Sequence, residues 1–173
     1  MSLKGNKVEN WNNDYSTLGT TYSSELNTPV ALLTAIQNEF VCEDILKYLS
    51  NNRSAEVLEV GCGGARTSVY LGKVGFSKLT LSDNAEGALR LAKANLDKEG
   101  IVATVVNDDL FNTNLEKSSF DCIMSFGLLE HFEDLDTLTK SLTGFLKPGG
   151  IHIHCVITKK FSTIMLQDIV LYP

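Results

Sequence analysis

The stretch VLEVGCGGARTS, residues 57–68, decides the fold of this chain. A short apolar run that contains Glu59 leads into glycines at 61, 63 and 64, and then into a segment that can open a helix. Glycine lets a backbone turn sharply and come close to a ligand, because no side chain intervenes. The pattern predicts a buried strand, a tight turn able to hold a nucleotide, and a helix. The glycines alone are a weak signal, since a plain tight turn looks the same.

Strand and helix patterns alternate from this stretch to residue 157. Further strands are expected at 78–83, 101–108, 120–126 and 151–157, and helices at 66–75, 85–100 and 134–146. Such alternation indicates right-handed crossovers and a mostly parallel sheet covered on both faces. The expected fold class is α/β, with a Rossmann-like, doubly wound sheet.

The segment before the first strand has a different character. Residues 5–27 are polar and predict irregular structure, whereas Thr28 and Pro29 read as the cap and first residue of a helix. A second helical pattern follows at 39–52, with Phe40, Ile45, Leu46 and Leu49 on one face. We therefore predict a cap segment over 1–52 and a core domain over 53–173.

Composition limits the function classes. A chain of 173 residues with 43% hydrophobic content can bury one sizeable core. Its formal net charge of −6 opposes contact with nucleic acid, and no apolar stretch is long enough for a membrane span. The amino terminus lacks the apolar core of a signal peptide, so a cytoplasmic protein is expected. The four cysteines form no CxxC pair and are expected to be free thiols.

Residues with useful chemistry follow the predicted strands. Glu59 and Gly61 belong to the first strand end, Asp83 ends the second, Asp108 and Asp109 end the third, and residues 125–131 follow the fourth. In an open parallel sheet, ligands bind outside the carboxyl ends of the strands, where the strand order reverses. We expect these residues to meet in one crevice.

Two details favour a positively charged nucleoside over a dinucleotide. The dinucleotide fingerprint needs Gly or Ala at its sixth place, where this chain has Arg66. Glu59 would repel a pyrophosphate but would suit an ammonium or sulfonium charge. Asp83, twenty positions after Gly63, is suitably placed to bind ribose hydroxyls in either case.

The motifs between residues 55 and 157 resemble the class I S-adenosylmethionine-dependent methyltransferases. VLEVGCGGA is similar to the first motif of that family, and LSDNAEGALRLAK to its second strand with a ribose-binding acid. VVNDDLF resembles the acidic turn on the adenine side, FDCIMSFGLLEHFED the fourth-strand motif, and LKPGGIHI the turn into the fifth strand. All five stand in the order of the family, and S-adenosylmethionine is the cofactor that the resemblance implies.

The resemblance also implies roles for individual residues. Asp83 would bind both ribose hydroxyls with Asn84 beside it, whereas Asp108 is expected to be solvated. The family commonly has a third glycine where this chain has Ala65, whose methyl group would crowd the turn. The remaining cofactor contacts would be Glu59, Gly61, Cys62 and Gly63 at the methionine portion, Asp109 and Leu110 at the adenine, and Ser125, Phe126 and Gly127 as the floor near the sulfonium.

The acid–base residues are harder to assign, because methyl transfer needs alignment more than a general base. His131 and Glu130 are the candidates to take a proton from an acceptor, and a role within the next helix fits them equally. His152 and His154 alternate onto one strand face, but His131, the third histidine, is expected far from His152. No metal site is therefore predicted.

The segments before and after the predicted core also lead to expectations. Trp11, Tyr15 and Tyr22 would form part of a lid by the same resemblance, or would simply anchor a loose end. The sheet of the family continues with two more strands, whereas here only an apolar helical stretch at 159–172 remains. A missing carboxyl-terminal region or a second subunit, as in a homodimer, is expected to cover the exposed fifth strand.

The expected partner is a small-molecule acceptor, with no nucleic acid and no membrane. Two other functions stay open. One is a non-catalytic S-adenosylmethionine-binding module or supporting subunit. The other is an NAD-dependent oxidoreductase, which Arg66 and Glu59 disfavour.

Overall fold

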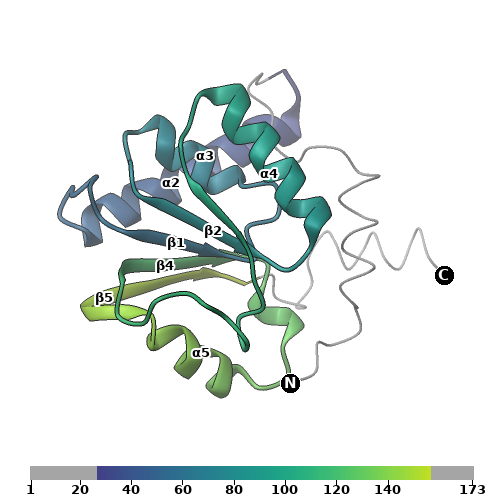
Figure 1. Ribbon diagram of the computed structural model, residues 1–173. Helices are drawn as coiled ribbons and strands as arrows, with labels where there is room; N and C mark the ends of the chain where they lie inside the picture. Colours follow the sequence, from purple (N-terminus) through teal and green to yellow (C-terminus); the bar gives the residue numbers. More distant parts are fainter. Residues whose placement is uncertain (1–26, 157–173) are drawn as a thin grey trace, which may run out of the picture.

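The computed structural model describes residues 27–156. These residues form a parallel sheet that is covered by helices on both faces (Figure 1). Within that range the five strands lie in the order β3-β2-β1-β4-β5. The elements are α2 (Pro29–Tyr48), β1 (Val57–Val60), α3 (Arg66–Lys73), β2 (Leu79–Asp83), α4 (Glu86–Glu99), β3 (Thr104–Asn107), β4 (Phe120–Phe126), η1 (Leu129–His131), α5 (Leu135–Thr143) and β5 (Leu146–Cys155). The predicted doubly wound α/β fold is confirmed.

Strand β1 is the centre of the sheet. Its four residues are all buried, and it pairs in parallel with β2 on one side and β4 on the other. A strand covered on both faces needs a nearly continuous apolar run, which explains the sequence VLEV. The chain adds β2 and β3 on one side and β4 and β5 on the other, so the strand order reverses beside β1. The crevice expected of such a fold therefore lies at the carboxyl end of β1.

Each face of the sheet carries its own core. In Figure 1, α2, α3 and α4 lie above the sheet and α5 lies below it. Ile45 of α2 and Val69 of α3 pack with Leu81 of β2 in the upper core. Ile123 of β4 and Leu142 of α5 belong to the lower core. Helices on both faces leave the strand ends as the place where a ligand can reach the sheet.

Helix α2 corrects one prediction. Residues 29–48 form a single helix where two helical segments were expected. Thr28 caps it as predicted, because its Oγ1 accepts a hydrogen bond from Ala31 N at 3.1 Å. Phe40 was predicted to share a buried face with Ile45, but Phe40 is 64% exposed and Ile45 is fully buried. Five positions of a helix amount to about 140° of rotation, which separates the two side chains.

The upper core includes residues that were predicted to belong to a separate cap. Cys42 and Ile45 of α2 lie in the same cluster of buried side chains as Leu81 of β2. The domain boundary at residue 52 stays a prediction. Trp11, Tyr15, Tyr22 and the stretch 159–172 lie outside the described residues.

The remaining boundaries follow the sequence with small shifts. Gly100 ends α4 in the left-handed conformation, at φ 66°, as its place after the helix predicted. The LKPGG segment, expected as a turn, forms the start of β5, and the register between β4 and β5 shifts between Phe120 and Cys122. β5 pairs with β4 alone among the described strands. Between residues 27 and 156, no helix is long and apolar enough to cross a membrane.

Candidate functional site

The turn after β1 is shaped by residues with positive φ. Gly61 and Gly63 have φ values of 62° and 51°, and a Cβ at Gly61 would lie 2.7 Å from Leu128 Cδ1. Ala65 also adopts a left-handed conformation, at φ 61°, although it has a side chain. Left-handed backbone favours glycine, because a Cβ crowds the following carbonyl oxygen. The turn is therefore tight. At Ala65, where crowding by the methyl group was predicted, the backbone is strained.

Glu59 of β1 lies directly below this turn. Its side chain is 3% exposed, and its Oε2 accepts hydrogen bonds from Ser68 N at 3.2 Å and from Ser68 Oγ. Burial raises the pKa of Glu59 to about 7, although the bonds from Ser68 and the nearby Arg66 charge act in the opposite direction. A positive ligand charge would favour the ionised form of this carboxyl group.

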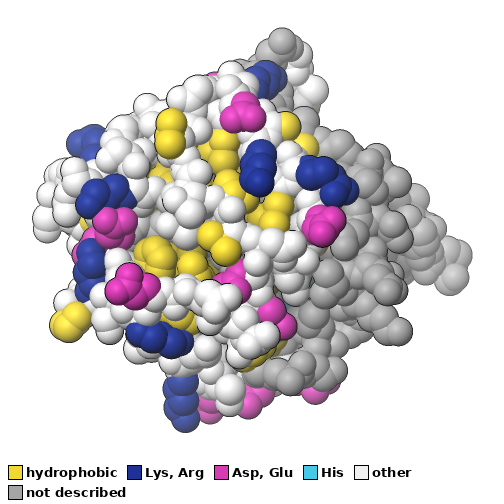
Figure 2. Space-filling view, viewed as in Figure 1, with side chains coloured by type: hydrophobic (Ala, Val, Ile, Leu, Met, Phe, Trp, Pro, Cys, Tyr) yellow, Lys and Arg dark blue, Asp and Glu magenta, His cyan; other side chains and the backbone are white. Residues whose placement is uncertain are grey.

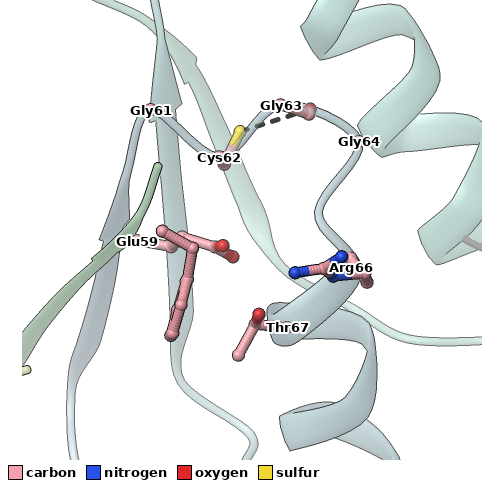
Figure 3. A pocket seen from close by; sticks show the side chains of 8 residues that line it. Glu59, Gly61, Cys62, Gly63, Gly64, Arg66 and Thr67 are labelled. Carbon is pink, nitrogen blue, oxygen red and sulfur yellow. Dashed lines mark hydrogen bonds between the residues drawn. The ribbon is translucent and has the colours of Figure 1, made fainter. Parts of the chain in front are cut away.

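One pocket opens beneath the turn, and Figure 3 shows the side chains that line it. The carboxylate of Glu59 and the guanidinium of Arg66 extend toward each other there, with Thr67 beside them. The pocket has a volume of about 170 Å³ and is open to solvent. It is lined by Glu59, Gly61, Cys62, Gly63, Gly64, Arg66, Thr67 and Phe126. Five of these were predicted as cofactor contacts, whereas Gly64, Arg66 and Thr67 were not.

Asp83 connects the second strand to the glycine turn. Its Oδ2 accepts a hydrogen bond from Gly63 N at 2.9 Å, and its Oδ1 accepts one from Ala85 N at 2.9 Å. Burial raises the pKa of the Asp83 carboxyl group, and these backbone bonds oppose that shift. Asn84 follows and is half-buried. Asp83 therefore fixes the relative position of the turns after β1 and β2.

Of the two acids after β3, Asp108 is not where it was predicted to be. Asp108 was expected to be solvated, but it is only 9% exposed and its Oδ2 accepts a hydrogen bond from Thr113 Oγ1. Asp109 is exposed, and its Oδ1 accepts a bond from Phe111 N at 3.0 Å. Leu110 is buried beneath them. The correction has a simple cause, since consecutive residues leave a strand in opposite directions and the loop covers only one of them.

The segment after β4 is held by β5. Ser125 is fully buried, and its Oγ lies 2.8 Å from His154 Nδ1. Gly127, with φ 68°, donates its N–H to Cys155 O at 2.9 Å. Of the predicted floor Ser125–Gly127, only Phe126 lines the pocket.

The acid–base candidates and three of the four cysteines do not line the pocket, whereas Cys62 does. Glu130 and His131 lie in η1, which begins two residues after Gly127. All four cysteines are free, as predicted, and three of them are buried. In residues 27–156, no three His, Cys, Asp or Glu side chains come together in a way that could hold a metal ion.

Comparison with known proteins adds a family to this geometry. A family profile described as a methyltransferase domain matches residues 57–150, from the start of β1 into β5. A ubiquinone biosynthesis O-methyltransferase of Rickettsia felis is 24% identical over 135 residues, which cover 78% of this chain and 54% of that protein. The enzyme of the same name from Proteus mirabilis is 32% identical over 110 residues, 63% of this chain and 42% of the relative. The chain thus spans about half the length of the curated relatives it matches.

Solved structures with the same fold extend the comparison. A putative S-adenosyl-L-methionine-dependent methyltransferase of Methanococcus maripaludis has a TM-score of 0.65 and 20% identity, covering 100% of this chain and 76% of that one. A coclaurine N-methyltransferase bound to N-methylheliamine and SAH has a TM-score of 0.65 and 14% identity, covering 88% and 45%. At such identities the similarity shows the fold alone.

Proposed function

The chain belongs to the family of methyltransferase domains, and from that premise we propose that it binds S-adenosylmethionine under the glycine turn and methylates a small-molecule acceptor. One observation carries the proposal: a buried carboxylate, Glu59, faces the Arg66 guanidinium across a single pocket. Opposite charges that line one pocket suit the ammonium and carboxylate groups of an amino acid. The methionine portion of the cofactor is such a group.

The residues around the pocket fit a nucleoside as well. The carboxylate of Asp83 accepts backbone hydrogen bonds from Gly63 N and Ala85 N, and the backbone N–H of Asn84 also favours its ionised form. A carboxylate can accept about four hydrogen bonds, so Asp83 retains acceptor capacity for the ribose. Asn84 lies next to it in the chain. Absence of a side chain at Gly61 and Gly63 would let the backbone approach the ligand.

The loop after β3 would contact the adenine portion of the cofactor. Asp109 is exposed, whereas Asp108 is engaged by Thr113. This difference supports Asp109 as the acid that accepts a hydrogen bond from the adenine amino group, with a backbone contact from Leu110. Cys62 and the floor Ser125–Gly127 would then surround the methionine and sulfonium portions.

When bound, S-adenosylmethionine supplies an electrophilic methyl group on a positively charged sulfur. The contribution of the protein is to hold this methyl group and the acceptor atom close and in line, which can supply much of the rate. Glu59 would balance the positive charge of the ligand. Glu130 or His131, both in η1, would take a proton from an acceptor that loses one.

The class of acceptor is proposed from charge and from the relatives. Lys, Arg, Asp and Glu side chains are interspersed on the face shown in Figure 2, where no basic patch gathers. This distribution, with the net charge of −6, favours a small molecule over a nucleic acid. The names of the curated relatives make an oxygen acceptor the first class to test.

A transfer assay tests the proposed activity. Purified protein is incubated with S-adenosylmethionine and a panel of small hydroxylated, amine and thiol acceptors, and S-adenosylhomocysteine release is measured. We expect release that depends on one acceptor class and is lost in Asp83→Ala. Cofactor binding with no transfer to any acceptor would favour the non-catalytic module instead.

A further inference from the structure

Four side chains form a hydrogen-bonded row from the interior to the surface, below the sheet. Ser125 Oγ lies 2.8 Å from His154 Nδ1, and His154 Nε2 lies 3.3 Å from His152 Nδ1. His152 Nε2 lies 3.1 Å from Thr143 Oγ1. Ser125 is fully buried at the end of β4, whereas Thr143 is exposed at the end of α5. We call these four residues the histidine row.

The far end of the histidine row fixes the direction of every hydrogen bond in it. Thr143 Oγ1 donates to the Thr139 carbonyl oxygen at 2.7 Å, so it can only accept from His152 Nε2–H. The bare Nδ1 of His152 then accepts from His154 Nε2–H, and the bare Nδ1 of His154 accepts from the Ser125 hydroxyl. A neutral imidazole has one donor and one acceptor nitrogen, so no other arrangement satisfies all the bonds.

Both rings must be neutral for this arrangement. Burial lowers the pKa of His152, and burial together with the neighbouring His152 lowers the pKa of His154 to about 4. The planes of the two rings are tilted by 32° to each other, with their centroids 5.2 Å apart. Near neutral pH, each ring therefore carries the single proton that the histidine row needs.

The inner end of the row adjoins the pocket. Ser125 immediately precedes Phe126, which lines the pocket, and Gly127 N is bonded to Cys155 O at 2.9 Å. His154 pairs with Ser125 in the strand register, and Cys155 pairs with Phe126. The tip of β5 thus holds Ser125 through a side chain and Gly127 through the backbone.

We propose that His154 and His152 are positioning residues for the segment Ser125–Gly127, of which Phe126 lines the pocket, and that both are held as the Nε2–H tautomer. They touch neither the pocket nor its ligand, and act by keeping the Ser125 hydroxyl directed into the histidine row. The identity of the ligand rests on the proposed function, whereas the row itself does not.

The first test is the tautomer of each ring. Two-dimensional ¹⁵N–¹H NMR of the whole chain near pH 7 separates Nε2–H from Nδ1–H histidines by their nitrogen shifts. We expect both His152 and His154 as Nε2–H, and a mixture of tautomers at His152 in Thr143→Val, which removes the outer acceptor. An Nδ1–H ring at either position of the wild type, or an unchanged His152 in Thr143→Val, would overturn the proposal.

The second test is ligand affinity in two matched variants. His154→Asn keeps an acceptor near the Nδ1 position, whereas His154→Leu leaves the buried Ser125 hydroxyl unsatisfied. We expect about tenfold weaker S-adenosylhomocysteine binding by calorimetry in the leucine variant, and a loss of under about threefold in the asparagine variant. Ser119→Ala is the control, because it removes an exposed hydroxyl directly before β4, the strand of Ser125. It should bind S-adenosylhomocysteine like the wild type.

Equal affinity in all three variants would contradict the positioning role. If His154→Leu fails to fold, Thr143→Val takes its place, with a smaller loss of affinity expected. Absence of binding by the wild type would refute the proposed function, and the tautomers would still decide whether the histidine row is formed.

Discussion

The turns after β1 and β3 both bring carboxylates to the same end of the sheet, but they hold them differently. Glu59 belongs to the central strand, is 3% exposed and is bonded to Ser68. Asp109 follows an edge strand, is exposed and is bonded only locally, to Phe111 N at 3.0 Å. The position in the sheet explains this contrast, because a central strand is covered on both faces and an edge strand is not. The proposed methionine side is therefore buried and bonded to α3, whereas the proposed adenine side is exposed.

The largest expected effect concerns Glu59 and pH. Its pKa is raised from 4.5 to about 7, so the folded protein binds this proton more tightly than the unfolded chain between these values. The free energy of unfolding should therefore fall as pH rises from about 4.5 to 7, by about 3 kcal/mol. Glu59→Gln, which cannot titrate, should remove this slope. Urea unfolding of both proteins across that range measures it, and equal slopes would mean that Glu59 is not held in a buried site.

The next effect is that of Asp83 on ligand binding. Asp83→Ala removes the acceptor of Gly63 N and of the ribose hydroxyls, so S-adenosylhomocysteine affinity should fall about a hundredfold. Asp83→Asn keeps an acceptor oxygen and should lose less. Asp97→Ala, which removes an exposed acid on α4, is the control. Calorimetric affinities that are the same for Asp83→Ala and the wild type would refute the ribose assignment.

The two acids after β3 should separate stability from binding. Asp108→Asn weakens the bond from Thr113 and should lower the free energy of unfolding by about 1 kcal/mol, with little effect on affinity. Asp109→Asn should do the reverse and weaken S-adenosylhomocysteine binding about tenfold without changing stability. Denaturation and calorimetry on both variants give the answer. The opposite outcome would assign the adenine contact to Asp108.

The smallest effect is expected at Ala65. Its left-handed backbone costs about 1–2 kcal/mol for a residue with a side chain. Ala65→Gly would relieve that strain, but it would also lose a buried methyl group and make the unfolded chain more flexible. The change in the free energy of unfolding should stay within about 1 kcal/mol. Loss of much more stability in thermal or urea unfolding would show that the strain estimate for this turn is wrong.

The sequence predicted the parts of the site that lie within one local motif better than the parts that depend on distant contacts. Glu59, Gly61 and Gly63 stand within one local motif, so their spacing was enough to place them in one turn. In the sequence, Arg66 disfavours a dinucleotide; in the structure it also opens α3 and lines the pocket. Its signal was available, since the first helical turn after a glycine loop faces the same crevice. The family resemblance implies no role for Arg66.

Other features depend on contacts between distant parts of the chain. The sequence could not decide which of Asp108 and Asp109 is buried, because that depends on how the loop to Thr113 folds back. Strand alternation did predict that His152 and His154 share a face. Their partners Ser125 and Thr143 come from β4 and α5, and no local pattern identifies them.

Calorimetric titration of the whole chain with S-adenosylhomocysteine, with S-adenosylmethionine and NAD as parallel ligands, tests the proposed cofactor site most directly. Both sulfur nucleosides should bind at one site per chain and NAD should give no heat. Binding should become tighter as pH rises toward about 7, because Glu59 ionises. Absence of heat with both sulfur nucleosides, or binding of NAD alone, would contradict the proposed cofactor site.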